Sequence, residues 1–469
     1  MIAKQICEEV LEKALSTGGD FAEIFAESTY NNFYEQTANE VTKVTGSQIF
    51  GASIRILKGA LEVNGYTNNF SRESLLALAE KLSLAIGGSS KSVRVDLKEQ
   101  EVKNNHPVLV KPSSLKNEEK IKYLDKFYQS VKDYSPEISQ IIVSLRDEEQ
   151  YVLIANSKGR YVKDYRCHVN LSGTVVASDG KSTQTASNRL AGHIGYELFE
   201  RSDIENFAKE IAKTAITMLH ADEMVGGVMT VVVHNAFGGV LLHEACVHSL
   251  EATTVAKGTS VFSNMLGKKI ASDIVTAIDD GTIPNGWGSL NVDDEGEPTK
   301  RNILIENGIL KSYLVDYRNS LIMNHPVTGS SRRQNYKFSP TSRMTNTFFA
   351  PGNNSFEEII AKTEYGLFAK QMGGGSVNPA TGEFNFAVNE GYLIEKGRIT
   401  KPVRGATLVG SGKEVLMNID MIAKENLDFG FGMCGSLSGS IPTSVGQPTI
   451  RVQNMTVGGR GEKKWITNY

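Results

Sequence analysis

The chain has 469 residues, of which 40% are hydrophobic and 22% are charged. This composition is typical of globular proteins and excludes a disordered or fibrous chain, and the length predicts roughly two or three domains. The 50 Lys and Arg residues nearly balance the 53 Asp and Glu residues, and the net charge of −3 argues against a general nucleic-acid binder, which would carry a basic excess.

The first half of the chain is predicted to combine amphipathic helices with half-buried strands. Apolar residues recur at helical spacing in some segments and alternate with polar residues in others. Helices are expected over residues 2–15, 71–86, 118–134 and 204–219, with Ser71 and Asn117 as N-caps. Strands are expected within residues 21–66 and near residues 138–145, 151–156 and 161–177.

The second half is richer in glycine and in short strands. Gly226-Gly227 marks the change in composition, so we expect an N-terminal domain at 1–223 and a C-terminal domain at 224–469. The β-branched apolar run 228–234 predicts a buried strand, and residues 236–250 predict a helix capped by Asn235. Further strands are expected in hairpins at Asn307-Gly308 and Lys396-Gly397 and over 449–459. The fold class is α+β, with N-terminal helices and antiparallel strands before a strand-rich domain that carries helix 236–250.

The cysteines and the N-terminus indicate a soluble cytoplasmic protein. Three glutamates within the first twelve residues interrupt any apolar core of a signal peptide, and no apolar run approaches the roughly 18 residues of a membrane span. The four cysteines are far apart and form no CxxC pair, which fits reduced thiols better than a disulfide framework. These cysteines are Cys7, Cys167, Cys246 and Cys434.

His243 and His248 bracket Glu244 in an H-E-x-x-x-H pattern on the predicted helix. A zinc hydrolase needs neutral imidazole ligands, an open position for water and a carboxylate near that water. Histidines four residues apart lie about 40° apart around an α-helix, whereas five residues separate them by about 140°. Both histidines can share a metal only if a π-bulge interrupts the helix or the helix ends before His248. The spacing alone leaves open two unrelated histidines on an apolar helix.

Cys434 is the candidate for a third ligand. Gly432 and Gly435 lie close to it, and glycines allow the backbone to approach a site closely. A thiolate is a good zinc ligand, but a buried free cysteine is the commoner role of an isolated Cys. The residues alone leave both alternatives open.

Several charged or glycine-rich segments offer weaker signals. The acidic segments 278–282 and 292–299 lack the EF-hand pattern and favour acidic turns over a calcium site. Arg332, Arg333 and Arg343 could hold a peptide carboxylate, although such residues are more typical of solvated or surface-paired positions. Neither the glycines at 373–375 nor those at 410–412 form a phosphate-binding loop.

Long stretches of the second half resemble the TldD/TldE (PmbA) family, specifically its TldD type. The first half fits more loosely, through its length and its helix-then-strands order. The matching stretches occur in the family's order and include GVLLHEACVHSLE, KGTSVFS, IDDGT, VDDEGEPT, NILIENGILKSYLVD, SRMTNT, YLIEKGRITKPVRGATLVGSG, MCG and VGQPTIRVQNMTVGG.

The resemblance implies a zinc-dependent peptidase acting on unfolded proteins or peptides. By matching positions it implies that His243, His248 and Cys434 bind zinc and that Glu244 activates a zinc-bound water. It also implies a homodimer, or a heterodimer with a TldE-type chain that lacks this set. The near-neutral charge and the short apolar runs separately predict no direct contact to nucleic acid or membrane. It names no substrate-binding residue.

The chain departs from the family near the motif. Val247 stands where a small residue is usual, Ala252-Thr253-Thr254 stands where a Gly-Asp pair is usual, and Cys246 lies inside the motif, where it could compete for metal or oxidise. The competing function is a non-catalytic regulatory or binding protein of the same family, which has been associated with DNA gyrase modulation and toxin–antitoxin control. The intact set of four residues favours an enzyme, since a binder needs no base beside a metal.

Overall fold

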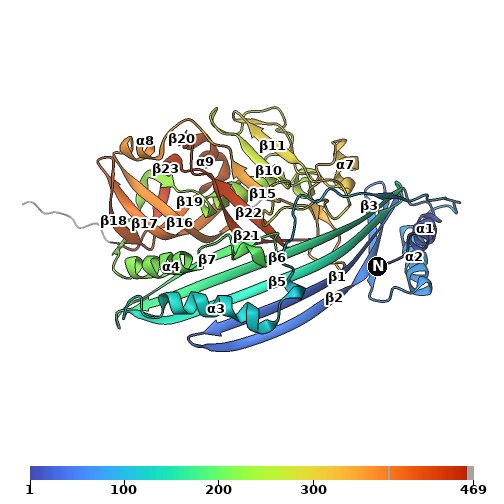
Figure 1. Ribbon diagram of the computed structural model, residues 1–469. Helices are drawn as coiled ribbons and strands as arrows, with labels where there is room; N and C mark the ends of the chain where they lie inside the picture. The colour runs from blue at the N-terminus through green and yellow to red at the C-terminus, as the bar shows by residue number, and fades with distance from the viewer. Residues whose placement is uncertain (379–380, 462–469) are drawn as a thin grey trace, which may run out of the picture.

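A long antiparallel sheet dominates the N-terminal half of the computed structural model, which describes residues 1–378 and 381–461 (Figure 1). Its strand order is β3-β2-β1-β5-β6-β4, and β7 also pairs with β6. The strands are β1 (Phe21–Thr37), β2 (Glu40–Lys58), β3 (Leu61–Thr67), β4 (Lys98–Gln100), β5 (Ile138–Asn156), β6 (Arg160–Ser178) and β7 (Thr183–Gly192).

Strand β5 corrects the prediction of two strands at 138–145 and 151–156, because the charged residues between them stay in the sheet. Their side chains alternate between its two faces. On one face, buried Asp147 accepts a hydrogen bond from Lys120 Nζ at 2.8 Å, and Glu149 accepts one from the Tyr165 hydroxyl. These long-range partners allow a polar stretch to continue as strand.

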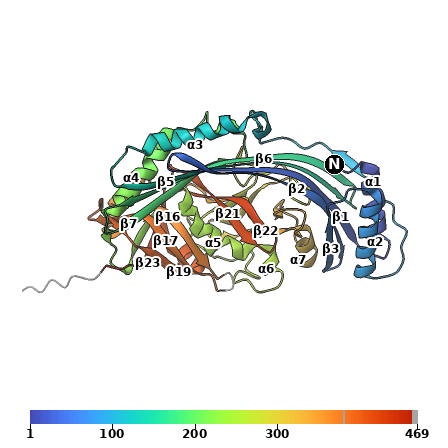
Figure 2. The same ribbon diagram turned by 90° about the horizontal axis from the view of Figure 1, so that it is seen from below.

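Helices cover one face of this sheet, and the C-terminal half lies against the other (Figure 2). The helices are α1 (Lys4–Leu15), α2 (Arg72–Ile86), α3 (Asn117–Val131) and α4 (Ile204–Leu219). The predicted cap is confirmed at Ser71, whose side chain accepts from the Ser74 N–H. The predicted cap at Asn117 is wrong, because the helix already includes Asn117 and the side chain of Glu119 accepts from the Lys116 N–H.

A closed ring of strands forms one part of the C-terminal half. The strand order is β16-β9-β23-β19-β17-β18-β8, and a further pairing between β16 and β17 closes the ring. The strands are β8 (Asp222–Glu223), β9 (Gly227–Val233), β16 (Tyr365–Val377), β17 (Glu383–Glu395), β18 (Arg398–Arg404), β19 (Thr407–Ser411) and β23 (Ile450–Gly458), and β20 (Ile419–Ile422) pairs with β23. The predicted strand at 228–234 is present, but only its last three residues are buried.

A second sheet of the C-terminal half has the order β12-β11-β10-β15-β22-β21, which leaves β21 at its edge. Its strands are β10 (Ala277–Asp280), β11 (Arg301–Glu306), β12 (Ile309–Leu310), β15 (Asn346–Phe349), β21 (Asp428–Ser436) and β22 (Gly439–Gln447). Both predicted hairpin turns are confirmed, since Asn307-Gly308 and Lys396-Gly397 have positive φ angles and join paired strands.

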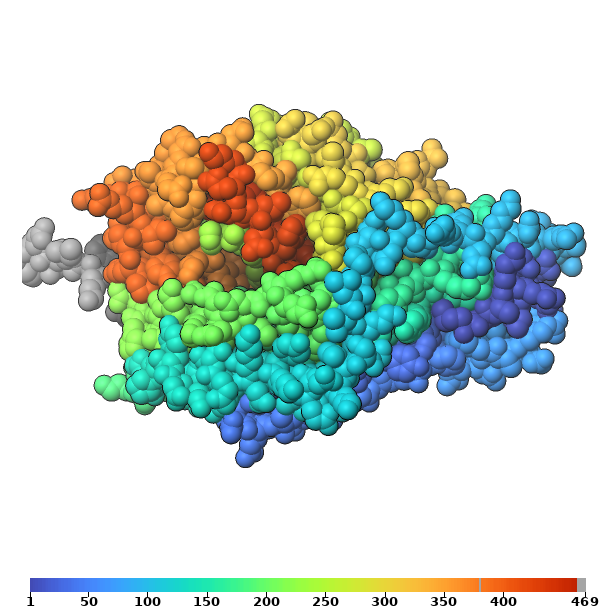
Figure 3. Space-filling view, viewed as in Figure 1, coloured from blue at the N-terminus to red at the C-terminus, as the bar shows by residue number. Residues whose placement is uncertain are grey.

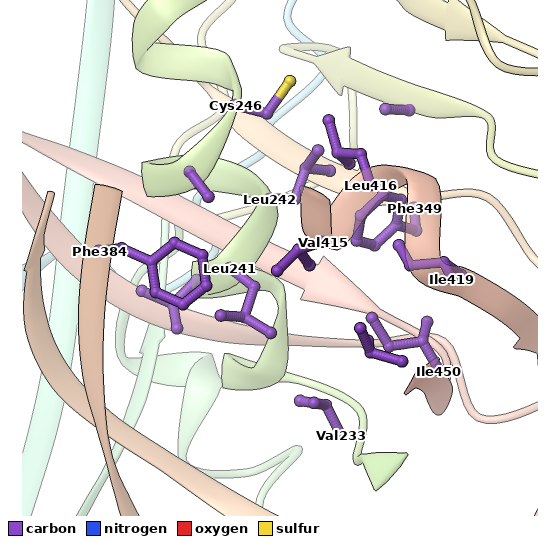
Figure 4. Close-up of a cluster of buried hydrophobic side chains, with 14 of the residues drawn as sticks. Val233, Leu241, Leu242, Cys246, Phe349, Phe384, Val415, Leu416, Ile419 and Ile450 are labelled. Carbon is purple, nitrogen blue, oxygen red and sulfur yellow. The ribbon is translucent and has the colours of Figure 1, made fainter. Parts of the chain in front are cut away.

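An apolar core lies between this sheet and the ring. Figure 4 shows Leu241 and Leu242 of helix α5 (Val240–Ala245) packed among Phe384, Val415 and Ile450.

The remaining elements are α6 (Ala252–Val255), α7 (Tyr317–Met323), α8 (Phe356–Ala361), α9 (Gly412–Asn418), β13 (Ser331–Arg332), β14 (Thr341–Ser342), η1 (Pro112–Ser114), η2 (Tyr196–Leu198), η3 (Phe237–Gly239) and η4 (Val247–Leu250). The α+β class is confirmed, and the domain boundary near Met224 stays a prediction.

Among the described residues, no helix combines the length and the apolar character that crossing a membrane requires. The N-terminal and C-terminal halves contact each other along their length (Figure 3). Between them, the surface is hollowed next to α4, drawn in green, and the red strands of the C-terminal half.

Buried ion pairs join the two halves. They correct the expectation that the acidic segment 292–299 forms a simple turn, and the expectation that Arg333 is a surface residue. Arg55 Nη2 lies 2.8 Å from Glu23 Oε2 and 2.5 Å from Glu295 Oε1, and Arg333 Nη2 lies 2.5 Å from Glu23 Oε1. Arg166 pairs with Asp294 in the same way at 2.7 Å. All these side chains are at most 4% exposed, so each charge depends on its partner.

We expect Glu23→Gln to destabilise the protein by about 3–5 kcal/mol, because it leaves two buried guanidinium groups without their shared carboxylate. Urea unfolding followed by circular dichroism measures the change. Glu80→Gln is the matched control: Glu80 pairs with Lys13 on the surface, where such a pair contributes under about 1 kcal/mol. Equal losses in the two variants would contradict the role of the buried network.

Candidate metal centre

Two close backbone contacts hold the short helix α5 in place. A Cβ at Gly239 would lie 2.4 Å from the backbone nitrogen of Gly446, so the helix starts directly against β22. A Cβ at Gly412 would lie 1.8 Å from the carbonyl oxygen of Ala245, so α9 closes against the other end of α5. Glycine at 239 and 412 therefore fixes where the helix begins and ends.

The helix ends at Ala245, which corrects the prediction of one helix over 236–250. Cys246 has φ −127° and ψ −60°, outside the helical region, and a separate 3-10 turn follows at Val247–Leu250. This break realises one of the two conditions for a five-residue spacing, a helix that stops before His248. It allows His243 and His248 to face the same point.

Cys434 completes a compact group of three side chains. Its Sγ lies 3.3 Å from His243 Nε2 and 3.3 Å from His248 Nε2. One donor atom from each of the three residues lies within 4.8 Å of the other two, an arrangement that could hold a metal ion. His243 and Cys434 are buried and His248 is half-buried. The structure thus brings together all three residues that were expected to bind metal.

Cys246 does not belong to this group. Its side chain is fully buried in the apolar core, as Figure 4 shows. Burial raises the pKa of the Cys246 thiol to about 12, which keeps it protonated near neutral pH. The structure therefore places this cysteine as a core residue.

Two further residues hold the group in position: Glu251, which no motif singled out, and Arg343, for which the sequence suggested contact with a peptide carboxylate instead. Glu251 Oε2 lies 3.3 Å from His248 Nδ1, the nitrogen opposite the one that faces Cys434. Arg343, which is fully buried, donates from Nη2 to the Cys434 carbonyl at 2.5 Å and lies 3.8 Å from Glu251 Oε1. A carboxylate on the far nitrogen fixes the orientation and tautomer of a ligand histidine. The sequence signal that could have indicated the Glu251–His248 contact was their spacing of three residues, which places two side chains on one side of a helical turn.

Burial and nearby charge set the protonation of the group. Burial, with smaller contributions from His248 and Arg343, lowers the pKa of His243 well below its usual value, which favours a neutral imidazole. Burial also lowers the pKa of His248, but the Glu251 carboxylate and the contact with Cys434 outweigh burial, and the net pKa lies well above its usual value.

Glu244 lies beside the group on its accessible side. Its Oε2 is 3.6 Å from His248 Nε2, and its side chain is 28% exposed. Burial raises the pKa of this carboxyl, His248 opposes the shift, and the negative charge of Glu251 adds to it. The result is a more basic carboxylate next to three potential ligands.

Family models describing the PmbA/TldA metallopeptidase match nearly the whole chain. Domain 1 matches residues 22–86, the central domain matches 110–219, and the C-terminal domain matches 226–459. The chain belongs to the PmbA/TldD metallopeptidase family. The candidate metal group and Glu244 lie within the region matched by the C-terminal model of this family.

Relatives within the PmbA/TldD family carry metalloprotease names. The chain is 40% identical to the metalloprotease TldD homolog of Haemophilus influenzae, over 74% of this chain and 73% of the relative. It is 35% identical to a Buchnera aphidicola homolog of the same name, over 87% and 86%. A Saccharolobus solfataricus relative named zinc metalloprotease TldD homolog is 28% identical over 96% and 99%.

Solved structures of similar proteins share the fold. A Thermotoga maritima protein described as a putative modulator of a DNA gyrase has a TM-score of 0.77 at 21% identity, covering 93% of this chain and 96% of the other. TldE from Thermococcus kodakarensis has a TM-score of 0.74 at 19% identity, covering 94% and 97%.

We expect the purified protein to carry about one metal ion per chain and Cys434→Ala to lose most of it, because two imidazoles alone bind metal much more weakly. Elemental analysis of both proteins measures the metal content. Cys246→Ala is the matched control, since it removes a thiol from the same region but not from the group. Equal metal content in wild type and Cys434→Ala would contradict the site.

Proposed function

We propose that this chain is a zinc-dependent peptidase that hydrolyses peptide bonds of unfolded proteins or peptides. The observation that carries this proposal is the convergence of two imidazole nitrogens and one thiol sulfur beside the Glu244 carboxylate. The metalloprotease names of the relatives support the reaction class.

The donor set fits zinc. Tetrahedral zinc with ordinary Zn–N and Zn–S bond lengths places a nitrogen and a sulfur ligand about 3.5 Å apart. Cys434 Sγ lies 3.3 Å from Nε2 of both His243 and His248. The name of the Saccharolobus solfataricus relative supports the same metal. His243, His248 and Cys434 would hold the ion, which supplies a Lewis acid that acidifies a water molecule and polarises a carbonyl group.

Glu244 would transfer the proton. Its carboxylate lies on the accessible side of the group, and its raised pKa makes it a better base than an exposed glutamate. It would accept a proton from the attacking water and donate that proton to the leaving amine. Glu251 and Arg343 act as positioning residues, because they contact His248 Nδ1 and the Cys434 backbone and not the donor atoms Nε2 and Sγ.

Edge strand β21 is the proposed place where a peptide chain binds. Among the described residues, β21 has one strand partner, β22, and one isolated bridge, from Ala236 to Phe429. Two of its carbonyl groups already accept side-chain hydrogen bonds, Gly432 from Trp287 Nε1 and Cys434 from Arg343 Nη2, so an added peptide would bond to the remaining backbone groups. An extended peptide can add to such an edge through backbone hydrogen bonds, with little sequence preference. Cys434 lies on this strand, so an added peptide would run beside the candidate ligands.

The proposed assembly is a homodimer or a heterodimer with a TldE-type chain. The similarity to the solved TldE structure supports a related partner. The outer side of β2 also supports an interface, since β2 pairs with β3 only over residues 52–58 and exposes Val41 and Val44 in its free part.

We expect Glu244→Gln to keep its metal and to lower peptide hydrolysis by about 10²–10⁴-fold, because the amide cannot accept the proton. Cleavage of a fluorogenic peptide and elemental analysis of the same sample measure both properties. Glu251→Gln is the comparison: it should lower metal affinity as well, because it weakens the support of His248. Full turnover by Glu244→Gln would exclude the proposed role.

An unfolded protein should be cleaved much faster than its folded form, because only an extended chain can add to a strand edge. Reduced, alkylated ribonuclease and native ribonuclease offer the same sequence in the two states, and gel electrophoresis follows their cleavage. Equal rates for the two would contradict recognition of extended chains.

A further inference from the structure

A cavity of about 590 Å³ lies between the N-terminal sheet and the β21–β22 hairpin. Figure 2 shows the sheet arching over these two strands. Every second residue of β5 from Ser144 to Gln150 and of β6 from Arg166 to Ser172 lines the cavity. This alternation places their side chains on the face opposite the helices.

The cavity and the candidate metal group lie on opposite faces of β21. Met433 lines the cavity, whereas the next side chain, Cys434, faces His243 and His248. Successive side chains of a strand point to opposite faces. The cavity is therefore separate from the metal centre and shares one strand with it.

Most charges that line the cavity are already paired. Arg166 pairs with Asp294, and Glu148 Oε1 lies 3.5 Å from His168 Nδ1. Arg333 pairs with Glu23 of the buried network. Both carboxylates of the lining, Glu148 and Asp294, thus have cationic or histidine partners.

Three further arginines of the lining have no carboxylate partner in the part of the chain that the structure describes. Over residues 1–378 and 381–461, no carboxylate lies within 4.0 Å of the guanidinium groups of Arg146, Arg189 or Arg332. Arg189 donates from Nε to the Ser172 hydroxyl, and Arg146 lies 5.4 Å from the centre of the Phe33 ring. The cavity therefore has an excess of positive charge.

Arg332 is the most deeply buried of the three, at 3% exposure. Its Nη1 donates to the carbonyl oxygens of Met344 and Pro442, both at 2.7 Å. No acceptor in the described part of the chain bonds to its Nε or Nη2. Burial lowers the pKa of Arg332 to about 10, and the nearby Asp294 and Asp279 carboxylates only partly oppose this shift. An anion in direct contact would give this buried cation the ion pair that it lacks within 4.0 Å.

We propose that this cavity binds the carboxylate of an acidic peptide through Arg146, Arg189 and Arg332. This inference rests on the proposed peptidase function, because it names a class of peptide for the same enzyme. Guanidinium groups bind carboxylates through paired, charge-assisted hydrogen bonds. Phosphate shares this chemistry, but a single small ion would leave the accessible apolar part of the lining, at Phe33 and Met433, without a partner.

Trp287 lines the cavity and serves as a fluorescent probe. The sequence holds one other tryptophan, so Trp465→Phe makes Trp287 the sole reporter, and Glu244→Gln in the same protein prevents turnover. The probes are an acetylated tetrapeptide of three alanines and a C-terminal glutamate, the same peptide with a C-terminal glutamine amide, and inorganic phosphate. We expect saturable binding of the acidic peptide and binding at least about tenfold weaker for the neutral one.

The combined change Arg146→Gln and Arg189→Gln should weaken binding of the acidic peptide by about tenfold or more, and added salt should weaken it in the parent protein. Among the described residues, neither of these side chains hydrogen-bonds to the backbone, so the fold should persist, which circular dichroism checks. Arg398→Gln is the matched control, because Arg398 is exposed on β18, away from the cavity.

Equal affinity for the acidic and the neutral peptide, or unchanged binding in the double variant, would overturn the proposal. Phosphate that binds as tightly as the acidic peptide and displaces it would overturn the peptide assignment in favour of a free oxyanion. Because binding is measured without turnover, its failure is distinguishable from failure of the peptidase. A wild type that cleaves peptides while the cavity binds none would overturn this inference alone.

Discussion

The Glu23 carboxylate, held between Arg55 and Arg333, is the contact on which the arrangement of the two halves depends. Arg55 and Glu23 come from neighbouring strands of the N-terminal sheet, and Arg333 comes from the C-terminal half. A buried charge without its partner costs several kcal/mol, so the sheet is restricted to a position that satisfies all of these groups. That position sets the distance between the sheet and the β21–β22 hairpin, and with it the cavity between them.

The break at Cys246 is the second constraint, and it acts at the level of a single residue. An uninterrupted helix would turn His243 and His248 about 140° away from each other. By leaving the helical region there, the backbone brings the two imidazoles to one sulfur. Because the Cys246 side chain is part of the apolar core, the same residue that interrupts the helix also anchors it.

Local patterns predicted most elements, the family resemblance supplied the candidate site residues that spacing alone left open, and long-range contacts decided the rest. Helical periodicity and the Asn307-Gly308 turn depend on neighbouring residues, so the sequence contains them directly. The continuity of β5 depends on Lys120, which lies 27 residues from its partner Asp147, and no local pattern reports that contact. Arg343 was missed as a support of the group for the same reason, because it contacts the Cys434 carbonyl 91 residues along the chain. Glu251 lies only three residues from His248, but that spacing alone does not distinguish a support from an ordinary surface carboxylate.

The position of β21 between two compartments limits how this segment can change in length. Adjacent side chains of a strand face opposite sides, so inserting or deleting one residue between 428 and 433 would exchange the faces of Met433 and Cys434. A thiol would then enter the cavity and a thioether would replace it beside the histidines. Homologous chains should therefore differ here mainly by substitution. Any insertion or deletion in the part of the strand before the cysteine should involve an even number of residues.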